Sequence, residues 1–113
     1  GNDYLFGEDG NDILNGGAGI DNLYGGAGDD TFIFDDVAST NAVNDFATGN
    51  NTLDVSAFDL IGTDPGQYAD LAALKTGAMT EVSGTTTIDL DGDDSVILVG
   101  ISISSLDSGD FIF

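Results

Sequence analysis

A period of nine residues organises the first third of the chain. The copies, aligned in register, are residues 1–6 (GNDYLF, the tail of an earlier copy), 7–15 (GEDGNDILN), 16–24 (GGAGIDNLY) and 25–33 (GGAGDDTFI). An aspartate recurs in step at Asp3, Asp12, Asp21 and Asp30, and a large apolar residue recurs at Leu5, Leu14, Leu23 and Phe32. A flexible Gly/Asp linker is the plain alternative, but linkers of low complexity lack phased apolar residues. The strict repeat therefore indicates stacked structural units.

The residue types within each copy predict a turn followed by a short strand. Gly-Gly-x-Gly permits left-handed backbone torsions and close packing of turns, and the three residues after each aspartate include one large apolar side chain. A turn with a strand is half of a coil, so two copies form one coil of a parallel β-roll. Stacked coils then place Leu5 over Leu23, and Leu14 over Phe32. We therefore expect an all-β chain that begins with such a roll.

Stacking also brings the turns together along the two edges of the roll. Residues 7–12 should lie against residues 25–30 on one edge, and Asp3 against residues 16–21 on the other. Carboxylates and turn carbonyls would then form oxygen-lined cages between coils, in which the carboxylates repel one another unless a cation is present. A phosphate-binding loop is excluded because no GK[ST] follows the glycines and the charge has the wrong sign. The pattern predicts cation binding in the turns.

The charge balance agrees with this interpretation. The 113 residues include 21 acidic side chains, no His and one basic residue, Lys75, which gives a formal net charge of −20. Such repulsion opposes the compact state unless cations neutralise it, and it disfavours nucleic acid, whose phosphates bind Lys and Arg. Without His or Cys the usual zinc ligands, disulfides and thiol chemistry are absent. The abundant oxygen ligands favour a hard cation such as calcium.

The repeats resemble the RTX (repeats-in-toxin) family, whose nonapeptide is G-G-x-G-x-D-x-large-x. The resemblance implies two or more Ca²⁺ ions, each between turns one coil apart, held by the position-six aspartate, often the position-five residue, and backbone carbonyls. One implied metal site comprises Gly7, Asp9, Gly10, Asn11, Asp12, Gly25, Gly26, Ala27, Gly28, Asp29 and Asp30. The other comprises Asn2, Asp3, Gly16, Gly17, Ala18, Gly19 and Asp21.

Four residues depart from the motif or lie just outside it. Glu8 replaces the second glycine of its copy, so it either distorts that turn or adds a ligand. Ile20 supplies no oxygen at position five, which predicts a weaker site. Asp35 and Asp36 are out of motif and could close a further cage against the 16–21 turn.

The remainder of the chain, residues 37–113, predicts a β-rich cap with one short helix. Residues 64–76 have helical character, with Asp64 as N-cap and Pro65 in the first turn. Residues 85–90 and 95–101 have the pattern of two strands joined at Asp91-Gly92-Asp93-Asp94, a hairpin signal. The cluster Asp89, Asp91, Asp93 and Asp94 is either a second calcium site or a solvated turn. The turn is favoured because turns collect Asp and Gly and the EF-hand glutamate is missing.

The C-terminal part resembles that of serralysin-type RTX proteins. The shared features are TFIF after the last repeat, the late hairpin, the terminal DFIF (residues 110–113) and a DF..G...LDVS segment formed by Asp45, Phe46, Gly49, Leu53, Asp54, Val55 and Ser56. This resemblance implies type I secretion from a Gram-negative cell, directed by an uncleaved C-terminal signal. DFIF also fits the final strand of the core, and both interpretations can hold. The chain starts within a repeat and lacks an initial Met, so we expect a C-terminal piece of a longer protein.

These observations favour a non-enzymatic, monomeric module. Residues 1–36 would bind calcium and fold on binding, and residues 37–113 would cap the roll and carry the signal for the type I secretion machinery. The alternative is a calcium-stabilised adhesin or carbohydrate-binding end module, which exposed aromatics at Tyr4, Phe6 and Tyr24 would favour. An enzyme is disfavoured because His, Cys and a G-x-S-x-G motif are all absent. Membrane insertion is not expected, because no apolar run reaches the length of a bilayer span.

Overall fold

Two β-sheets form the walls of the molecule in the computed structural model, which describes residues 1–35, 39–47, 49–62, 67–91 and 93–113. Within these residues one sheet has the order β1-β3-β5-β9-β8-β7 and the other β10-β6-β4-β2. The strands are β1 (Tyr4–Phe6), β2 (Ile13–Asn15), β3 (Asn22–Tyr24), β4 (Thr31–Ile33), β5 (Thr40–Val43), β6 (Thr52–Asp54), β7 (Met79–Val82), β8 (Thr85–Asp89), β9 (Ser95–Leu98) and β10 (Phe111–Ile112). The helices are α1 (Leu71–Gly77) and the 3-10 turns η1 (Ser56–Phe58), η2 (Ile103–Ser105) and η3 (Ser108–Asp110).

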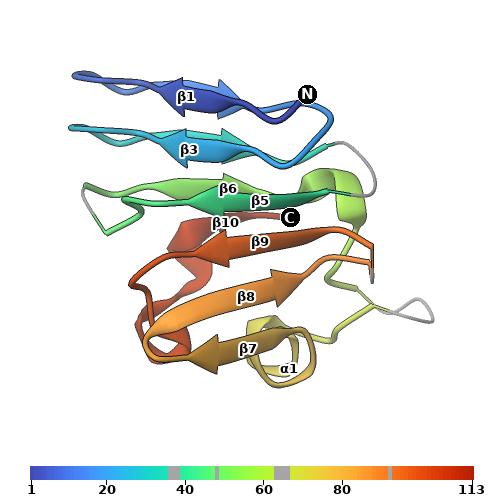
Figure 1. Ribbon diagram of the computed structural model, residues 1–113. Helices are drawn as coiled ribbons and strands as arrows, with labels where there is room; N and C mark the ends of the chain where they lie inside the picture. Colours follow the sequence, from blue (N-terminus) through green and yellow to red (C-terminus); the bar gives the residue numbers. More distant parts are fainter. Residues whose placement is uncertain (36–38, 48, 63–66, 92) are drawn as a thin grey trace.

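The repeats form a parallel β-roll in the predicted register. Leu5 pairs with Leu23, and Leu14 with Phe32, each across parallel strands. Successive strands alternate between the two sheets, so that β1 pairs with β3 and β2 pairs with β4. Paired residues are 18 positions apart, and 18 residues therefore complete one coil. Figure 1 shows β1, β3 and β5 stacked at one end of the molecule and the antiparallel strands with α1 at the other. The fold class inferred from the repeat is confirmed.

The roll continues for a third coil beyond the repeats. β5 pairs in parallel with β3, and β6 pairs in parallel with β4. Val43 and Leu53 take the inward positions that Leu23 and Phe32 hold one coil earlier, and all four are fully buried. Burial of one large side chain per strand gives the roll its core, at roughly 1.5–3 kcal/mol for each.

The cap is built on the same sheet. β9 pairs in parallel with β5, after which β8 and β7 add antiparallel strands. The predicted β8–β9 hairpin is confirmed, whereas β7 was not expected. The β7–β8 connection is Ser83-Gly84, with φ of 52° and 72°, and two left-handed residues match the twist of a tight hairpin. α1 packs on β7 and buries Leu74 completely.

The helix begins later than the sequence predicts. α1 starts at Leu71, and its N-cap is Asp70, whose side chain accepts the N–H of Ala73 at 2.8 Å. Tyr68 is extended instead, because its N–H donates to the carbonyl of Leu60 and its own carbonyl accepts the N–H of Gly62. The predicted N-terminal residues Asp64 and Pro65 lie outside the described part of the chain. Among the described residues, no helix has both the length and the apolarity to cross a membrane.

Candidate metal centre

The first edge of the roll stacks the turn 25–30 on the turn 7–12, as predicted. The Gly10 N–H donates to the carbonyl of Ala27, and the Ala27 N–H donates to the carbonyl of Glu8, each at 2.8 Å. Asp9 and Ala27 form a parallel bridge. The two turns therefore touch through their backbones, and their glycines allow the approach: a Cβ on Gly28 would collide with the carbonyl of Gly10.

The opposite edge stacks the turn 16–21 on residues 1–3. The N-terminal amine of Gly1 donates to the carbonyl of Ala18 at 2.8 Å, and the Ile20 N–H donates to Asn2 Oδ1 at 3.0 Å. A Cβ on Gly19 would collide with the carbonyl of Gly1. Both predicted pairs of turns are thus in contact. Gly17 lies at the open side of this edge and donates its N–H to Asn15.

The repeat aspartates use one carboxylate oxygen each to link coils. Asp21 Oδ1 accepts the N–H of Asp3 at 2.7 Å, and Asp30 Oδ1 accepts the N–H of Asp12 at 3.0 Å. The second oxygen, Oδ2, is buried without a hydrogen-bond partner at Asp12, Asp21 and Asp30. Asp21 is 0% and Asp30 1% exposed. A buried anionic oxygen with no partner is costly, so these three atoms mark where a cation is needed.

A backbone oxygen of the neighbouring turn lies near one of these places, beside Asp12. An ideal Cβ on Gly7 would lie 2.8 Å from Asp12 Oδ2 and 2.6 Å from the carbonyl oxygen of Gly25, in the turn one coil below. In the next two repeats a Cβ at this first position would collide with Oδ2 of the repeat's own aspartate. Carboxylate and carbonyl oxygens from two flexible turns form a donor set suited to calcium. The residues present fit this ion.

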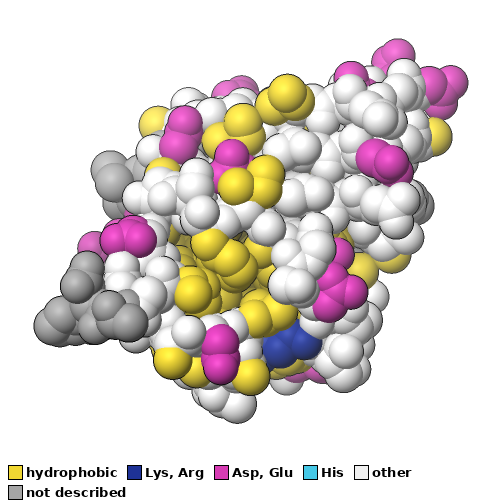
Figure 2. Space-filling model, turned by 180° about the vertical axis from the view of Figure 1, so that it is seen from behind, with side chains coloured by type: hydrophobic (Ala, Val, Ile, Leu, Met, Phe, Trp, Pro, Cys, Tyr) yellow, Lys and Arg dark blue, Asp and Glu magenta, His cyan; other side chains and the backbone are white. Residues whose placement is uncertain are grey.

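The described residues contain no group of three or more His, Cys, Asp or Glu side chains arranged to hold a metal. On the face shown in Figure 2, acidic side chains lie at several separate places. A cation in the turns would therefore be held by about one carboxylate per turn together with backbone carbonyls, the donor set that the repeats predict. The assignment of individual ligands stays a prediction.

The position-five side chains have another role in this structure. Asn11 Oδ1 accepts the N–H of Asp29 at 2.9 Å, and Asp29 Oδ1 accepts the N–H of Asn50 at 3.0 Å. Asn2 Oδ1 bonds the backbone of Ile20 in the same way. These side chains link each turn to the turn one coil away. Ile20 cannot form such a link, because its side chain has no polar atom. Their predicted role as ligands is not visible in these contacts.

Glu8 does not distort its turn. Its φ is 75°, close to the 69° and 94° of Gly17 and Gly26 at the same repeat position. A non-glycine residue therefore holds a left-handed conformation that glycine would adopt without strain. Asp35 accepts a hydrogen bond from Asn15 Nδ2 at 3.1 Å, and Asp36 lies outside the described residues.

Three residues of the third coil contact the repeat turns and were not predicted from the sequence. Asp45 accepts the N–H groups of Gly25 and Gly26 at 2.9 Å each. Asn41 Oδ1 accepts the N–H of Asp21 at 2.8 Å, and Asn51 Oδ1 accepts that of Asp30 at 2.7 Å. Their offsets from the repeat aspartates are 20 and 21 residues, so a strict period cannot find them. The sequence does carry a local signal: residues 41–43 (NAV) and 51–53 (NTL) have the same pattern as residues 21–23 (DNL) and 30–32 (DTF) of the repeats.

The acidic cluster of the late hairpin organises a turn. Asp91 Oδ1 accepts the N–H groups of Asp93 and Asp94 at 3.1 and 3.0 Å, and the bond from Asp93, with that from Asp94, lowers the pKa of Asp91 below its ordinary 3.8. Buried Asp94 accepts the N–H of Ser39 at 2.7 Å and so ties the hairpin to the roll. The turn interpretation fits these bonds better than a second calcium site does.

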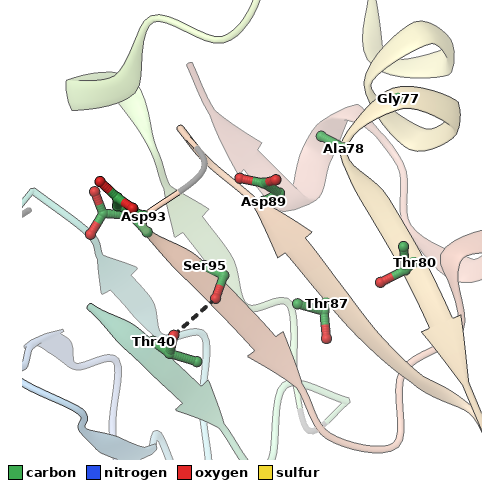
Figure 3. A pocket seen from close by; sticks show the side chains of 9 residues that line it. Thr40, Gly77, Ala78, Thr80, Thr87, Asp89, Asp93 and Ser95 are labelled. Carbon is green, nitrogen blue, oxygen red and sulfur yellow. Dashed lines mark hydrogen bonds between the residues drawn. The ribbon is translucent and has the colours of Figure 1, made fainter. Parts of the chain in front are cut away.

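Beside this turn lies an open pocket of about 370 Å³ on the face of the sheet. Its lining includes Thr40, Thr80, Thr87 and Ser95, with Asp89 and Asp93 toward one end (Figure 3). The hydroxyls of Thr40 and Ser95 lie 3.1 Å apart and hydrogen-bond to each other across β5 and β9. Its lining residues lie outside the stacked turns.

Comparison with known proteins agrees with the geometry of the roll. The family model for the RTX calcium-binding nonapeptide repeat (4 copies) matches residues 1–23 and 6–40. Among solved structures, the chain is similar to the AlgE6R3 subunit from the Azotobacter vinelandii mannuronan C5-epimerase, with 26% identity and a TM-score of 0.60 over 97% of this chain and 67% of that chain. No curated protein matches the chain significantly. Residues 1–40 thus match the RTX calcium-binding nonapeptide repeat, and the strands β1 to β4 within them form the first coils of a parallel β-roll.

Proposed function

We propose that this chain is a calcium-dependent folding module at the C-terminal end of a longer secreted protein. The observation that carries the proposal is the set of three buried carboxylate oxygens without partners, at Asp12, Asp21 and Asp30. The chain's own residues position these oxygens and exclude water from them. A bound calcium ion would supply the positive charge that offsets the carboxylates. We place the ion-dependent part at residues 1–36 and the cap at 37–113.

We propose two or more ions, with at least one on each edge of the roll. The first edge would use the carboxylates of Asp12 and Asp30 with the carbonyls of turns 7–12 and 25–30. The second would use Asp3 and Asp21 with the turn 16–21. Calcium is favoured over magnesium because the donors come from irregular turns, and magnesium demands a near-ideal octahedron.

Binding would be coupled to folding because the unfolded turns have no preformed cage. Extracellular calcium modules have Kd values of roughly 10⁻⁴–10⁻³ M, so millimolar calcium, about 1–10 times such a Kd, would stabilise the folded state by about 0.4–1.4 kcal/mol per site. In a compartment with little calcium, the net charge of −20 would keep the repeats open. RTX proteins are typically secreted, and an open chain that folds outside the cell suits export through a narrow channel.

The proposed route is type I secretion from a Gram-negative cell, with the signal in the last residues. β10 pairs in parallel with β6, and Phe111 is buried, so Phe111–Ile112 form the last strand of the core. Ile112 and Phe113 are exposed in the same segment and would be available for recognition. Under this proposal the module is non-catalytic, and any activity of the longer protein would reside in residues outside this chain.

A titration of the metal-free chain tests the proposal. Isothermal calorimetry with CaCl₂ should show two or more ions per chain, and circular dichroism should show a gain of β-structure over the same range. MgCl₂ should give a much weaker response at equal concentration. Absence of both heat and spectral change at millimolar calcium would refute calcium-dependent folding.

Carbohydrate binding is the second candidate, and an exposed aromatic face favours it. Tyr4 is 69% and Phe6 63% exposed, and the rings of Phe6 and Tyr24 stack at 4.7 Å. The similar subunit comes from an enzyme named mannuronan C5-epimerase. The charge of this chain suits a neutral glycan better than an acidic one. Tyrosine fluorescence titrated with neutral oligosaccharides in calcium, for the native chain and Phe6→Ala, would detect such binding; equal flat responses would exclude it.

A further inference from the structure

The third coil repeats the backbone geometry of the calcium-binding coils with asparagine in place of aspartate. Asn41 and Asn51 accept the N–H groups of Asp21 and Asp30, as those aspartates accept from Asp3 and Asp12. The strand hydrogen bonds continue in step, with Thr52 N–H donating to Asp30 at 2.8 Å as Thr31 N–H donates to Asp12 at 2.8 Å. Position six of each coil is therefore occupied by a side chain whose Oδ1 has the same role.

The second terminal atom of that side chain differs between the coils. In the repeats it is Oδ2, buried and without a partner, and it lies against the first residue of its own turn, five positions earlier. In the third coil it is Nδ2. Asn51 Nδ2 donates to the carbonyl of Phe46, also five positions earlier, at 3.1 Å. Asn41 Nδ2 donates to Ser39 Oγ at 3.2 Å.

The chemistry of the two groups explains the difference. An ionised carboxylate only accepts hydrogen bonds, so opposite a carbonyl-rich turn it needs a cation. A carboxamide accepts at one atom and donates at the other, and it carries no charge. Asn41 and Asn51 are 4% and 3% exposed, yet both ends of each amide are bonded within the protein. The two kinds of turn thus differ in one atom at position six. A turn with aspartate Oδ2 there needs an ion, and a turn with asparagine Nδ2 does not.

We infer that Asn41 and Asn51 end the row of calcium sites and make the third coil a calcium-independent template on which the repeats fold. The inference rests on the proposed calcium binding of the repeats and adds where that requirement stops. It assigns β5 and β6 to the permanently folded part of the molecule, together with the cap. Calcium binding then folds the two coils of β1 to β4 onto β5 and β6, which are already in place.

Reciprocal isosteric substitutions test this template. Asp30→Asn supplies the missing donor, so in chelator its melting temperature should rise above that of the native chain, and calorimetry should count at least one calcium fewer. Asn51→Asp creates a buried carboxylate opposite the Phe46 carbonyl, so its melting temperature in chelator should fall. Calcium should restore it, with one ion more per chain. Asp93→Asn, an exposed change of the same charge, is the control and should shift neither quantity.

The outcomes separate the inference from the proposal beneath it. If the native chain binds no calcium, the proposed function fails. If the native chain binds calcium but Asp30→Asn is no more stable in chelator and loses no ion, the template inference is overturned. The inference is also overturned if Asn51→Asp is as stable in chelator as the native chain. Should Asn51→Asp yield too little folded protein, Asp30→Asn decides alone.

Discussion

Replacing Gly26 with alanine measures how tightly the turns must stack. Gly26 has φ of 94°, a conformation that costs an L-residue about 1–2 kcal/mol. An added Cβ would also collide with the backbone carbonyl group of Glu8 in the turn one coil away, and such overpacking costs about 1–3 kcal/mol more. Alanine recovers about 0.4–1 kcal/mol by restricting the unfolded chain. We expect a net loss of about 1–5 kcal/mol of folding free energy in calcium.

Gly17 provides the matched control. It has the same repeat position and φ of 69°, but an added Cβ would meet no atom within 4 Å. Gly17→Ala should therefore cost only about 1 kcal/mol, the torsional part less the unfolded-state gain. Urea denaturation of both variants at saturating calcium gives the two free energies. Equal costs would mean that turns 7–12 and 25–30 are not in backbone contact, and the assigned register would be wrong.

The stacked turns, the left-handed Glu8 and the exposed C-terminus each lead to a further prediction. Asp12→Ala and Asp30→Ala should each weaken calcium binding and be non-additive in a double-mutant cycle by roughly 0.5–3 kcal/mol, because their turns stack; strict additivity in calorimetry would separate them into independent sites. Glu8→Gly should stabilise the fold by about 0.5–1 kcal/mol in urea denaturation, because it relieves a left-handed residue at the cost of glycine entropy; a destabilised variant would show that the Glu8 side chain has a binding role. Replacing the exposed Ile112 and Phe113 with serine should reduce export of a fused cargo while calcium affinity is unchanged, and normal export would place the signal elsewhere.

The C-terminal residues are better tested by substitution than by deletion, because β10 is part of the sheet. The sequence places Asp110–Phe113 far from the repeat turns, which suggests that deleting them would leave calcium binding intact. β10 pairs with β6, however, and the Val55 N–H donates to the carbonyl of Ile112. Deletion would therefore remove the strand that pairs with β6 and leave one edge of the third coil, on which the repeats stack, without its neighbour. Substitution of exposed side chains avoids this.

The roll was predictable because its register is encoded locally. Each copy carries its own turn glycines, one aspartate and one apolar side chain, so the period alone fixes which residues stack. Leu14 over Phe32 and the paired turns needed no tertiary information. The late hairpin was predictable for a similar reason, since its turn signal lies between two apolar strands.

The third coil could not be found in this way. Its turns are longer than those of the repeats, so Asn41 and Asn51 fall out of the period, and their role depends on which backbone N–H lies opposite. The predicted start of α1 is too early because Tyr68 is held in an extended bridge with Ile61, a pairing that the helical pattern does not show. The unpartnered Oδ2 atoms are a property of packing as well, because the sequence alone does not show which carboxylate oxygen is buried.

Hydrogen exchange with and without a calcium chelator is the sharpest test of calcium-coupled folding. We expect the amides of β1 to β4 to lose their protection when calcium is removed, because the carboxylates of Asp12, Asp21 and Asp30 are then buried without a counter-charge. The amides of β5, β6, β8 and β9 should stay protected in the same sample, and calcium should restore the pattern. Protection of β1 to β4 that survives chelation would show a preformed scaffold, and calcium-coupled folding would be wrong.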